Sequence, residues 1–308
     1  MKRIFITGPT GAIGIALINH LVGMNHEVVA ICRKNSQRLK NIPQSHKIKI
    51  VECDLYEINE HSEELGNGDY FFHLAWHGTS GAERNDLDLQ LKNIQYTLDC
   101  LRLSKKLGCK KFVGIGSQAE YGIKNEKLTA DSSTNPLTGY GIGKLCASYM
   151  SKIEAKKLKM EFNWVRILSI YGPYDGKHTL IMSLIDKMIK NQDIELTEGV
   201  QIWDYLYSED AARALWLIAE KGITEKTYVL GSGSAVELKQ YIEIINKIIP
   251  NHSNLLWGRI SYTPQSIMYL CASNEELHAD TGFKPETSFE TGILNTYLWY
   301  KEYVYEKN

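Results

Sequence analysis

Short apolar runs alternate with longer segments in the first half of the chain, and the two kinds of segment follow different periods. The short runs carry β-branched residues, which indicates strands, whereas the longer segments repeat apolar residues every three or four positions, which indicates helices. The expected strands are Lys2–Thr7, Glu27–Cys32, Ile48–Cys53, Tyr70–Ala75, Lys111–Gly116 and Asn163–Ile170, and the expected helices are Gly11–Val22, Leu87–Leu107 and Thr138–Leu158. Because strands and helices alternate, the pattern predicts an α/β fold of the Rossmann type, with a doubly wound parallel sheet.

This alternation weakens after Tyr171-Gly172-Pro173. The later pattern predicts helices at Thr179–Lys190, Asp210–Lys221 and Leu238–Ile249, a strand at Thr227–Leu230 and a short aromatic segment at Trp203–Tyr207, while Ser253–Tyr269 has no clear period. We therefore expect a dinucleotide-binding domain over residues 1–172 and a smaller substrate-binding region over residues 173–308. Segments near residues 203–230 are expected to return to the main sheet.

Composition excludes several classes of protein. A net charge of −1 over 308 residues gives no electrostatic reason to expect nucleic acid or an anionic membrane as a partner. No apolar run approaches the roughly 20 residues of a membrane span, and Met1–Ile6 leads directly into a strand rather than a signal peptide. The six cysteines lack a C-x-x-C pair and the nine histidines suggest no metal site, so we expect a cytoplasmic protein with reduced thiols and no metal.

A glycine-rich turn joins the first strand to the first helix, with the sequence Gly8-Pro9-Thr10-Gly11-Ala12-Ile13-Gly14. Small residues let the backbone approach a pyrophosphate, and the helix N-terminus offers free N–H groups. The position after a strand and before a helix makes this a dinucleotide-binding pattern. Expected cofactor contacts here are Gly8, Thr10, Gly11, Ala12 and Ile13.

The end of the second expected strand indicates which dinucleotide binds. An acidic residue there would bind the ribose of NAD, but the sequence has Arg33-Lys34, which suits the 2′-phosphate of NADP. We therefore expect NADPH as the cofactor, with NADH as the alternative. The simpler interpretation of Arg33 and Lys34 is that both are solvated charges in a loop. Strand-end position also places Asp54-Leu55 near the adenine and Leu74-Ala75-Trp76 along the phosphates, although Asp54 could equally be a helix N-cap.

Tyr140 and Lys144 are four residues apart on an expected helix, so they share a face. An ammonium beside a phenol favours the phenolate and lowers the phenol pKa from about 10 toward neutrality. Such a phenol can exchange a proton with a carbonyl oxygen. Ser117 ends the fifth expected strand, 23 residues before Tyr140. These three residues are the candidate catalytic set.

The chain resembles the extended short-chain dehydrogenase/reductase family that acts on nucleotide sugars. The resemblance is carried by the glycine turn, His73-Leu74-Ala75, Asn93, the run from Ser117 to Gly122, Tyr140 with Lys144, the run from Arg166 to Pro173, and Trp203-Asp204-Tyr205. It implies that Ser117 hydrogen-bonds the reacting sugar oxygen, that Tyr140 is the acid/base, and that Lys144 holds the nicotinamide ribose. It also implies a cofactor contact from Asn93 and a homodimer formed through helices such as Leu87–Leu107 and Thr138–Leu158.

The substrate-binding residues follow less directly from this resemblance. Ser169 replaces an asparagine that is usual in the family, and Trp203 stands where many relatives carry a phosphate-binding arginine. Arg259 is therefore our candidate cation for the substrate diphosphate, against the simpler interpretation of a surface arginine. Trp76 and Gln118 are the other expected substrate contacts, together with Ser117 and Tyr140.

Departures from the family pattern narrow the expected reaction. The resemblance implies that dehydratases of the family carry a run like Thr-Asp-Glu where this chain has Ser117-Gln118-Ala119, so we do not expect a 4,6-dehydration. It also implies that the 3,5-epimerase/reductases carry a cysteine at the position of Ala119, so we do not expect epimerisation before reduction. Glu120 could approach the pocket, but a surface glutamate at the strand end is the simpler interpretation. The segments Trp76–Gly81 and Trp257–Tyr269 resemble 4-ketoreductases that make dTDP-fucose, CDP-abequose or CDP-paratose.

The resulting hypothesis is NADPH-dependent reduction of the C4 ketone of a nucleoside-diphosphate 4-keto-6-deoxyhexose. The best guess for the substrate is dTDP-4-dehydro-6-deoxy-D-glucose, which would give dTDP-D-fucose. An NAD-dependent nucleotide-sugar 4-epimerase is the main alternative. A non-catalytic NADP-binding sensor is a remote one, because such proteins tend to lose the tyrosine and lysine.

Overall fold

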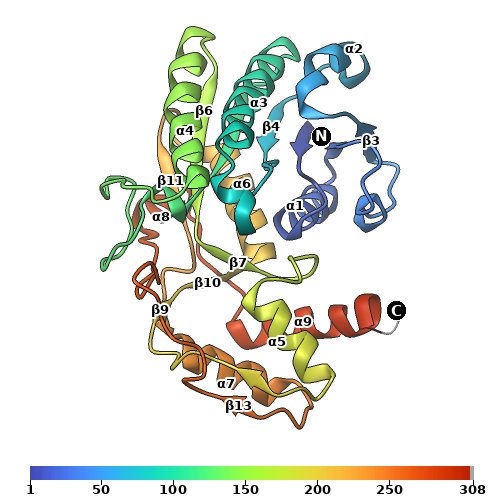
Figure 1. Cartoon of the computed structure of the whole chain (residues 1–308). Coiled ribbons are helices and arrows are strands. Elements are labelled where there is room, and N and C mark those ends of the chain that lie inside the picture. Colours follow the sequence, from blue (N-terminus) through green and yellow to red (C-terminus); the bar gives the residue numbers. More distant parts are fainter. Residues whose placement is uncertain (306–308) are drawn as a thin grey trace.

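The computed structural model describes residues 1–305. A seven-stranded parallel sheet forms the centre of the protein (Figure 1), and its strand order is β11–β6–β5–β4–β1–β2–β3. Its strands are β1 (Arg3–Thr7), β2 (Glu27–Cys32), β3 (Ile48–Glu52), β4 (Tyr70–His73), β5 (Lys111–Ser117), β6 (Glu161–Ile167) and β11 (Thr227–Leu230). The central strands β4 and β5 are buried along their whole length, as expected for a parallel sheet covered on both faces. The predicted Rossmann-type fold class is confirmed.

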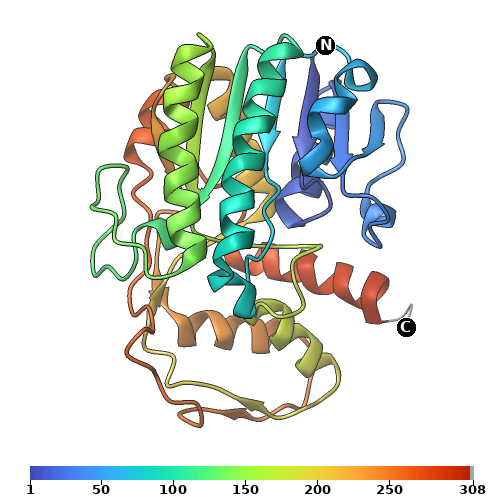
Figure 2. The same ribbon diagram turned by 45° about the horizontal axis from the view of Figure 1, so that its top comes forward.

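Helices cover both faces of this sheet (Figure 2). One face packs against α3 (Leu87–Lys106) and α4 (Gly139–Lys157), which lie side by side, and the other packs against α1 (Ala12–Gly23) and α6 (Ser208–Lys221). The strand order reverses between β1 and β4. In sheets of this kind the ligand binds at that reversal, beyond the carboxyl ends of the strands.

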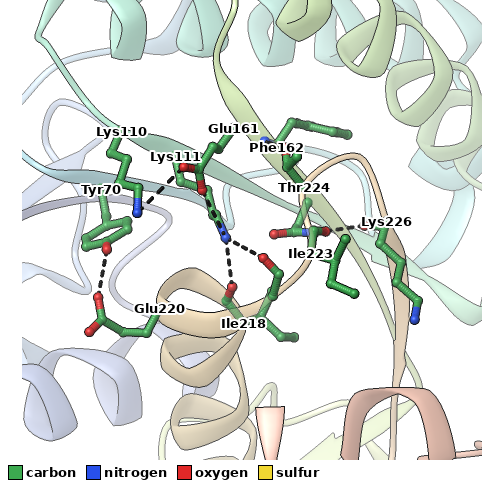
Figure 3. A network of polar contacts seen from close by, with 12 residues as sticks. Tyr70, Lys110, Lys111, Glu161, Phe162, Ile218, Glu220, Ile223, Thr224 and Lys226 are labelled. Atoms are coloured by element: carbon green, nitrogen blue, oxygen red, sulfur yellow. Dashed lines mark hydrogen bonds and ion pairs between the residues drawn. The ribbon is translucent and has the colours of Figure 1, made fainter. Parts of the chain in front are cut away.

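A buried lysine ties α6 to the amino-terminal side of the sheet (Figure 3). The Lys111 side chain on β5 is only 2% exposed, and its Nζ donates to the carbonyl oxygens of Gly222 at 2.7 Å and Ile218 at 3.3 Å. A cation at a helix C-terminus interacts favourably with the helix dipole. The Asn163 side-chain amide likewise donates to the carbonyl of Ile223 at 2.6 Å. These contacts attach α6 and the following strand β11 to β5 and β6.

The C-terminal region lies beyond the carboxyl ends of the strands and has its own apolar core (Figure 1). The helices of this region are α5 (Leu180–Ile189), α7 (Leu238–Ile248) and α9 (Phe289–Tyr300). Two other helices lie outside it: α8 (Glu275–Thr281) packs on α6, and the short helix α2 (Ser62–Leu65) follows β3. Three two-stranded pairs complete the C-terminal region: β7 (Ser169–Tyr171) with β10 (Tyr205–Tyr207), β9 (Ile202–Trp203) with β12 (Val236–Glu237), and β8 (Ile194–Glu195) with β13 (Leu255–Leu256).

The structure differs from the sequence expectation in one strand and in two helices. The single strand expected at Asn163–Ile170 is wrong: β6 ends at Ile167, and β7 leaves the main sheet to pair with β10. The segment Ser253–Tyr269, for which no period was expected, contains only the short strand β13. No helix was expected at α8 or α9, and α9 packs against both α7 and β10, so apolar residues on several sides hide its helical period.

Within the described part of the chain, no helix has the length and apolar character needed to cross a bilayer. The six cysteines are free thiols, five of them buried.

Candidate active site

The glycine turn between β1 and α1 approaches the end of β4 closely. Gly8 has a φ of +68°, and a Cβ at this position would lie 2.7 Å from the backbone nitrogen of Ala75, so a side chain would be both strained and obstructed. Gly11 is the N-cap of α1, and a Cβ there would meet no described atom within 4 Å. The helix N-terminus therefore faces open space that suits a pyrophosphate.

A cavity of about 310 Å³ runs from this turn to the end of β2. It is lined by Gly8, Thr10, Gly11, Arg33, Ser36, Arg38, Leu55, Leu74, Ala75 and Trp76, among others. Arg38 and Ser36 had not been predicted, because they lie several residues beyond the strand end; a second arginine in the same loop was the available signal. Lys34 does not line this cavity and instead pairs with Glu57 at 2.5 Å. Two arginines and a serine, with no acid directly after β2, are groups that can hold a phosphate.

Two predicted cofactor residues support this cavity from outside its lining. Asp54 caps the helical segment Leu55–His61 through a capping box with Glu57. This is the helix N-cap role that the sequence offered as an alternative to adenine contact. The Asn93 side chain on α3 accepts from the His77 N–H at 3.0 Å and donates to the His77 carbonyl at 2.9 Å. Asn93 thus holds the loop that carries Leu74, Ala75 and Trp76. Direct cofactor contact from Asp54 or Asn93 stays a prediction.

Tyr140 and Lys144 lie on the first turns of α4 and line a second cavity of about 290 Å³. The glycine turn, including Ala12 and Ile13, forms the opposite wall of this cavity. Thr138 begins the helix by accepting a hydrogen bond from the Gly141 N–H at 3.1 Å. The predicted catalytic tyrosine and lysine are therefore brought together with the dinucleotide-binding turn.

The electrostatics of this pair differ from the sequence expectation. Burial raises the pKa of Tyr140, and the groups that oppose this shift are the Ser117 hydroxyl, which hydrogen-bonds the phenol, and the Arg84 guanidinium, 4.5 Å from the ring centroid. The Lys144 Nζ donates to the Ile115 carbonyl at 2.6 Å and lies 3.9 Å from the Trp76 ring centroid. Burial lowers the pKa of Lys144 to about 7. A lowering of the Tyr140 pKa by Lys144 stays a prediction.

Ser117 is held by a buried glutamate. Glu120 Oε1 accepts hydrogen bonds from the Ser117 N–H at 2.9 Å and the Trp164 indole at 3.0 Å, while Oε2 accepts from Arg166 Nε at 2.7 Å. Glu120 is completely buried, so its interpretation as a surface glutamate is wrong. The reason is Arg166 on β6, which supplies the opposite charge next to it. Because three donors occupy its two oxygens and one of them is the charged Arg166, Glu120 orients the serine rather than serving as a free base.

A third cavity of about 330 Å³ extends toward the C-terminal region. It is lined by Ser169 and Trp203, and the Trp203 indole donates to Ser169 Oγ at 2.8 Å. The two residues that depart from the family pattern therefore bind each other. Asp175, which the sequence did not single out, lines both this cavity and the Tyr140 cavity.

Two further predicted substrate residues are less closely tied to these cavities. Gln118 follows Ser117 in a single helical turn and is half-buried. Arg259 is exposed and does not line the three cavities. Substrate contact by either residue stays a prediction.

The structure also groups Cys53, Glu57 and His61, whose ligand atoms lie within 4.8 Å of one another, although the sequence suggested no metal site. Glu57 already pairs with Lys34, and burial raises the pKa of the Cys53 thiol to about 12, so the thiolate that a metal needs is disfavoured.

A glycine turn, a tyrosine and a lysine line one cavity, and Ser117, which does not line it, lies next to the tyrosine. This arrangement is typical of a dinucleotide-dependent enzyme of the short-chain type. The chain belongs to the NAD dependent epimerase/dehydratase family, whose profile matches residues 4–231. It is 28% identical over 305 residues to a CDP-abequose synthase of Salmonella typhimurium, covering 95% of this chain and 96% of that protein. It is 25% identical over 331 residues to a probable dTDP-glucose 4,6-dehydratase of Sinorhizobium fredii, covering 97% and 93%.

Solved structures show the same fold at lower identity. A UDP-N-acetylglucosamine 4-epimerase from Methanobrevibacter ruminantium, in complex with UDP-N-acetylmuramic acid, superposes with a TM-score of 0.89 at 22% identity, covering 97% of this chain and 98% of that one. A dTDP-glucose 4,6-dehydratase from Streptomyces venezuelae with NAD bound has a TM-score of 0.84 at 19% identity, covering 98% and 97%. Relatives thus include synthases, dehydratases and epimerases of nucleotide sugars.

Proposed function

We propose that the protein uses NADPH to reduce the C4 ketone of a nucleoside-diphosphate 4-keto-6-deoxyhexose in the cytoplasm. The observation that carries this proposal is the composition of the end of β5. Ser117 faces Tyr140, and Gln118 and Ala119 stand where the family resemblance gives dehydratases two acidic residues. Glu120, which follows them, is bound to Arg166. The best substrate candidate is dTDP-4-dehydro-6-deoxy-D-glucose, with dTDP-D-fucose as the product.

The residues of the site divide the work of such a reduction. The glycine turn and the arginines after β2 would hold NADPH, which supplies a hydride when bound. The Tyr140 hydroxyl would protonate the oxygen that forms at C4, and the Ser117 hydroxyl would hydrogen-bond the same oxygen. Lys144 would hold the nicotinamide ribose, as the family resemblance implies.

An NADPH-oxidation assay over dTDP-, CDP-, GDP- and UDP-linked 4-keto-6-deoxy sugars tests this function. We expect stoichiometric NADPH consumption with one nucleotide, and NMR of the product gives its C4 configuration. The main alternative is a nucleotide-sugar 4-epimerase, because some relatives of this chain are 4-epimerases. Tightly bound NAD(H) in the purified protein, with interconversion of sugars and no net NADPH consumption, would establish that alternative instead.

The choice of cofactor is tested by Arg33→Asp. Removing a charge-assisted contact to the 2′-phosphate and adding a repulsive carboxylate should raise the Kd for NADPH by roughly 10- to 100-fold, while NADH binding changes little. Fluorescence titration with both cofactors measures the ratio. Lys40→Asp is the matched control, because Lys40 is exposed in the same loop but does not line the cavity between the glycine turn and the end of β2. An unchanged preference in Arg33→Asp would show that other residues select the cofactor.

We propose a homodimer formed through α3 and α4. Leu91 on α3 and Tyr149 and Ile153 on α4 are large apolar residues that are 63%, 58% and 60% exposed on two adjacent helices. Exposed apolar residues that gather in this way are typical of subunit contacts. Ile153→Asp should convert the dimer to a monomer in light scattering after size exclusion. Val200→Asp, at an exposed apolar position outside these helices, should leave the mass unchanged. A monomeric wild type would refute the proposal.

A further inference from the structure

Asp175 occupies the junction of three cavities around the active site. It lines the cavity that holds Tyr140 and Lys144 and the cavity that holds Ser169 and Trp203. It also lines a larger cavity of about 680 Å³ between the loop after β2 and α9. A ligand that spans from Tyr140 to the Ser169–Trp203 pair would therefore lie beside Asp175.

The loop that carries Asp175 is fixed from both sides. Tyr174 has a φ of +67°, a conformation that costs free energy for a non-glycine residue and persists only where surrounding contacts enforce it. Its carbonyl oxygen accepts a hydrogen bond from Arg38 at 2.7 Å, and its ring lies 4.7 Å from that of Trp299. The loop is thus bound to the cofactor-side loop through Arg38 and to α9 through Trp299, which gives Asp175 a defined position.

The carboxylate retains capacity to accept further hydrogen bonds. One oxygen accepts from the Gly176 N–H at 2.7 Å and the other from Thr179 Oγ1 at 3.0 Å, both within its own loop. An ionised carboxylate offers about four lone-pair sites, so roughly two stay available for a ligand. Burial raises the pKa of Asp175, because removal from water disfavours the charged form of the carboxyl group.

The chemistry of a carboxylate restricts what it can bind here. It accepts hydrogen bonds and repels anions, so it suits the hydroxyl groups of a sugar and not the diphosphate. We propose that Asp175 is a hexose-binding residue: its carboxylate accepts hydrogen bonds from sugar hydroxyl groups and fixes the ring between Tyr140 and the nucleotide. This inference rests on the proposed function, because it takes a nucleotide sugar as the substrate.

Calorimetric titration of Asp175→Asn separates binding of the sugar from binding of the nucleotide. Asparagine keeps the shape and one acceptor oxygen, so the loop should retain its fold. We expect the Kd for the preferred nucleoside diphosphate, chosen from dTDP, CDP, GDP and UDP, to stay within about twofold. The Kd for the matching nucleoside-diphosphate hexose should rise by roughly 10-fold or more, as expected for losing charged hydrogen bonds. Glu243→Gln, which removes an exposed carboxylate from α7, should change neither value.

The outcomes separate this inference from the proposed function. If the wild type binds no nucleoside-diphosphate hexose, the proposed function fails and the role of Asp175 fails with it. If the wild type binds the hexose conjugate and Asp175→Asn binds it equally well, only the role of Asp175 is refuted. Equal weakening of the nucleoside diphosphate and its hexose conjugate would also refute it, because Asp175 would then support the cavity as a whole. Unchanged NADPH fluorescence verifies that the variant is folded.

Discussion

Tyr140→Phe should lower kcat for the keto-sugar by at least roughly 100-fold, the low end of what loss of a general acid costs. The substitution removes only the phenol hydroxyl, which hydrogen-bonds Ser117, and keeps the ring beneath the Arg84 guanidinium and against Trp76. Since the ring contacts remain, we expect the KM to change much less than kcat. Steady-state NADPH oxidation on the substrate found in the nucleotide screen measures both constants.

The control for this experiment is Tyr56→Phe, which removes a phenol hydroxyl from a side chain that is 69% exposed and outside the cleft. It should leave kcat unchanged. NADPH binding by Tyr140→Phe should also persist, because the glycine turn and the arginines after β2 are untouched. Turnover close to that of the wild type in Tyr140→Phe would refute the mechanism, even if the substrate assignment is correct.

The parts of the site that the sequence predicted depend on local spacing. Tyr140 and Lys144 could be found because residues four apart on a helix share a face, and the glycine turn because its pattern lies between a strand and a helix. The fold class followed from the same alternation of periods. These features require no knowledge of which distant segments meet.

The residues that the sequence missed acquire their roles only through tertiary contacts. Glu120 is buried because Arg166, 46 positions later, lies next to it on the neighbouring strand. Asp175 lies in the loop after β7, where the sequence shows no periodic pattern. It reaches the cleft because β7 leaves the main sheet and pairs with β10. Arg38 reaches the cofactor cavity from beyond the end of β2 and at the same time contacts Tyr174. A pattern of single positions carries none of this information.

Glu120→Ala should reduce the free energy of unfolding by about 3–5 kcal/mol, the cost of removing one partner of a buried ion pair. Arg166 is 4% exposed, and although burial opposes its charged form, Glu120 and Tyr121 more than offset this and raise the pKa of Arg166. Without Glu120, the guanidinium stays charged and buried, and no carboxylate replaces the lost one: its partners are then the Ala130 carbonyl at 3.2 Å and the Tyr121 side chain. The Ser117 N–H and the Trp164 indole each lose their acceptor as well.

Urea unfolding of Glu120→Ala, Glu120→Gln and the exposed-site control Glu126→Ala measures this effect. Glutamine keeps an acceptor for Ser117 and Trp164 but removes the charge opposite Arg166, so its loss of stability should lie between those of the other two variants. Because Glu120 orients the end of β5, we also expect Glu120→Gln to lower kcat while the KM for NADPH stays constant. If Glu120→Ala were as stable as Glu126→Ala, the Glu120–Arg166 pair would contribute nothing to the fold, and the position of Ser117 would have to be maintained by β5 and α4 alone.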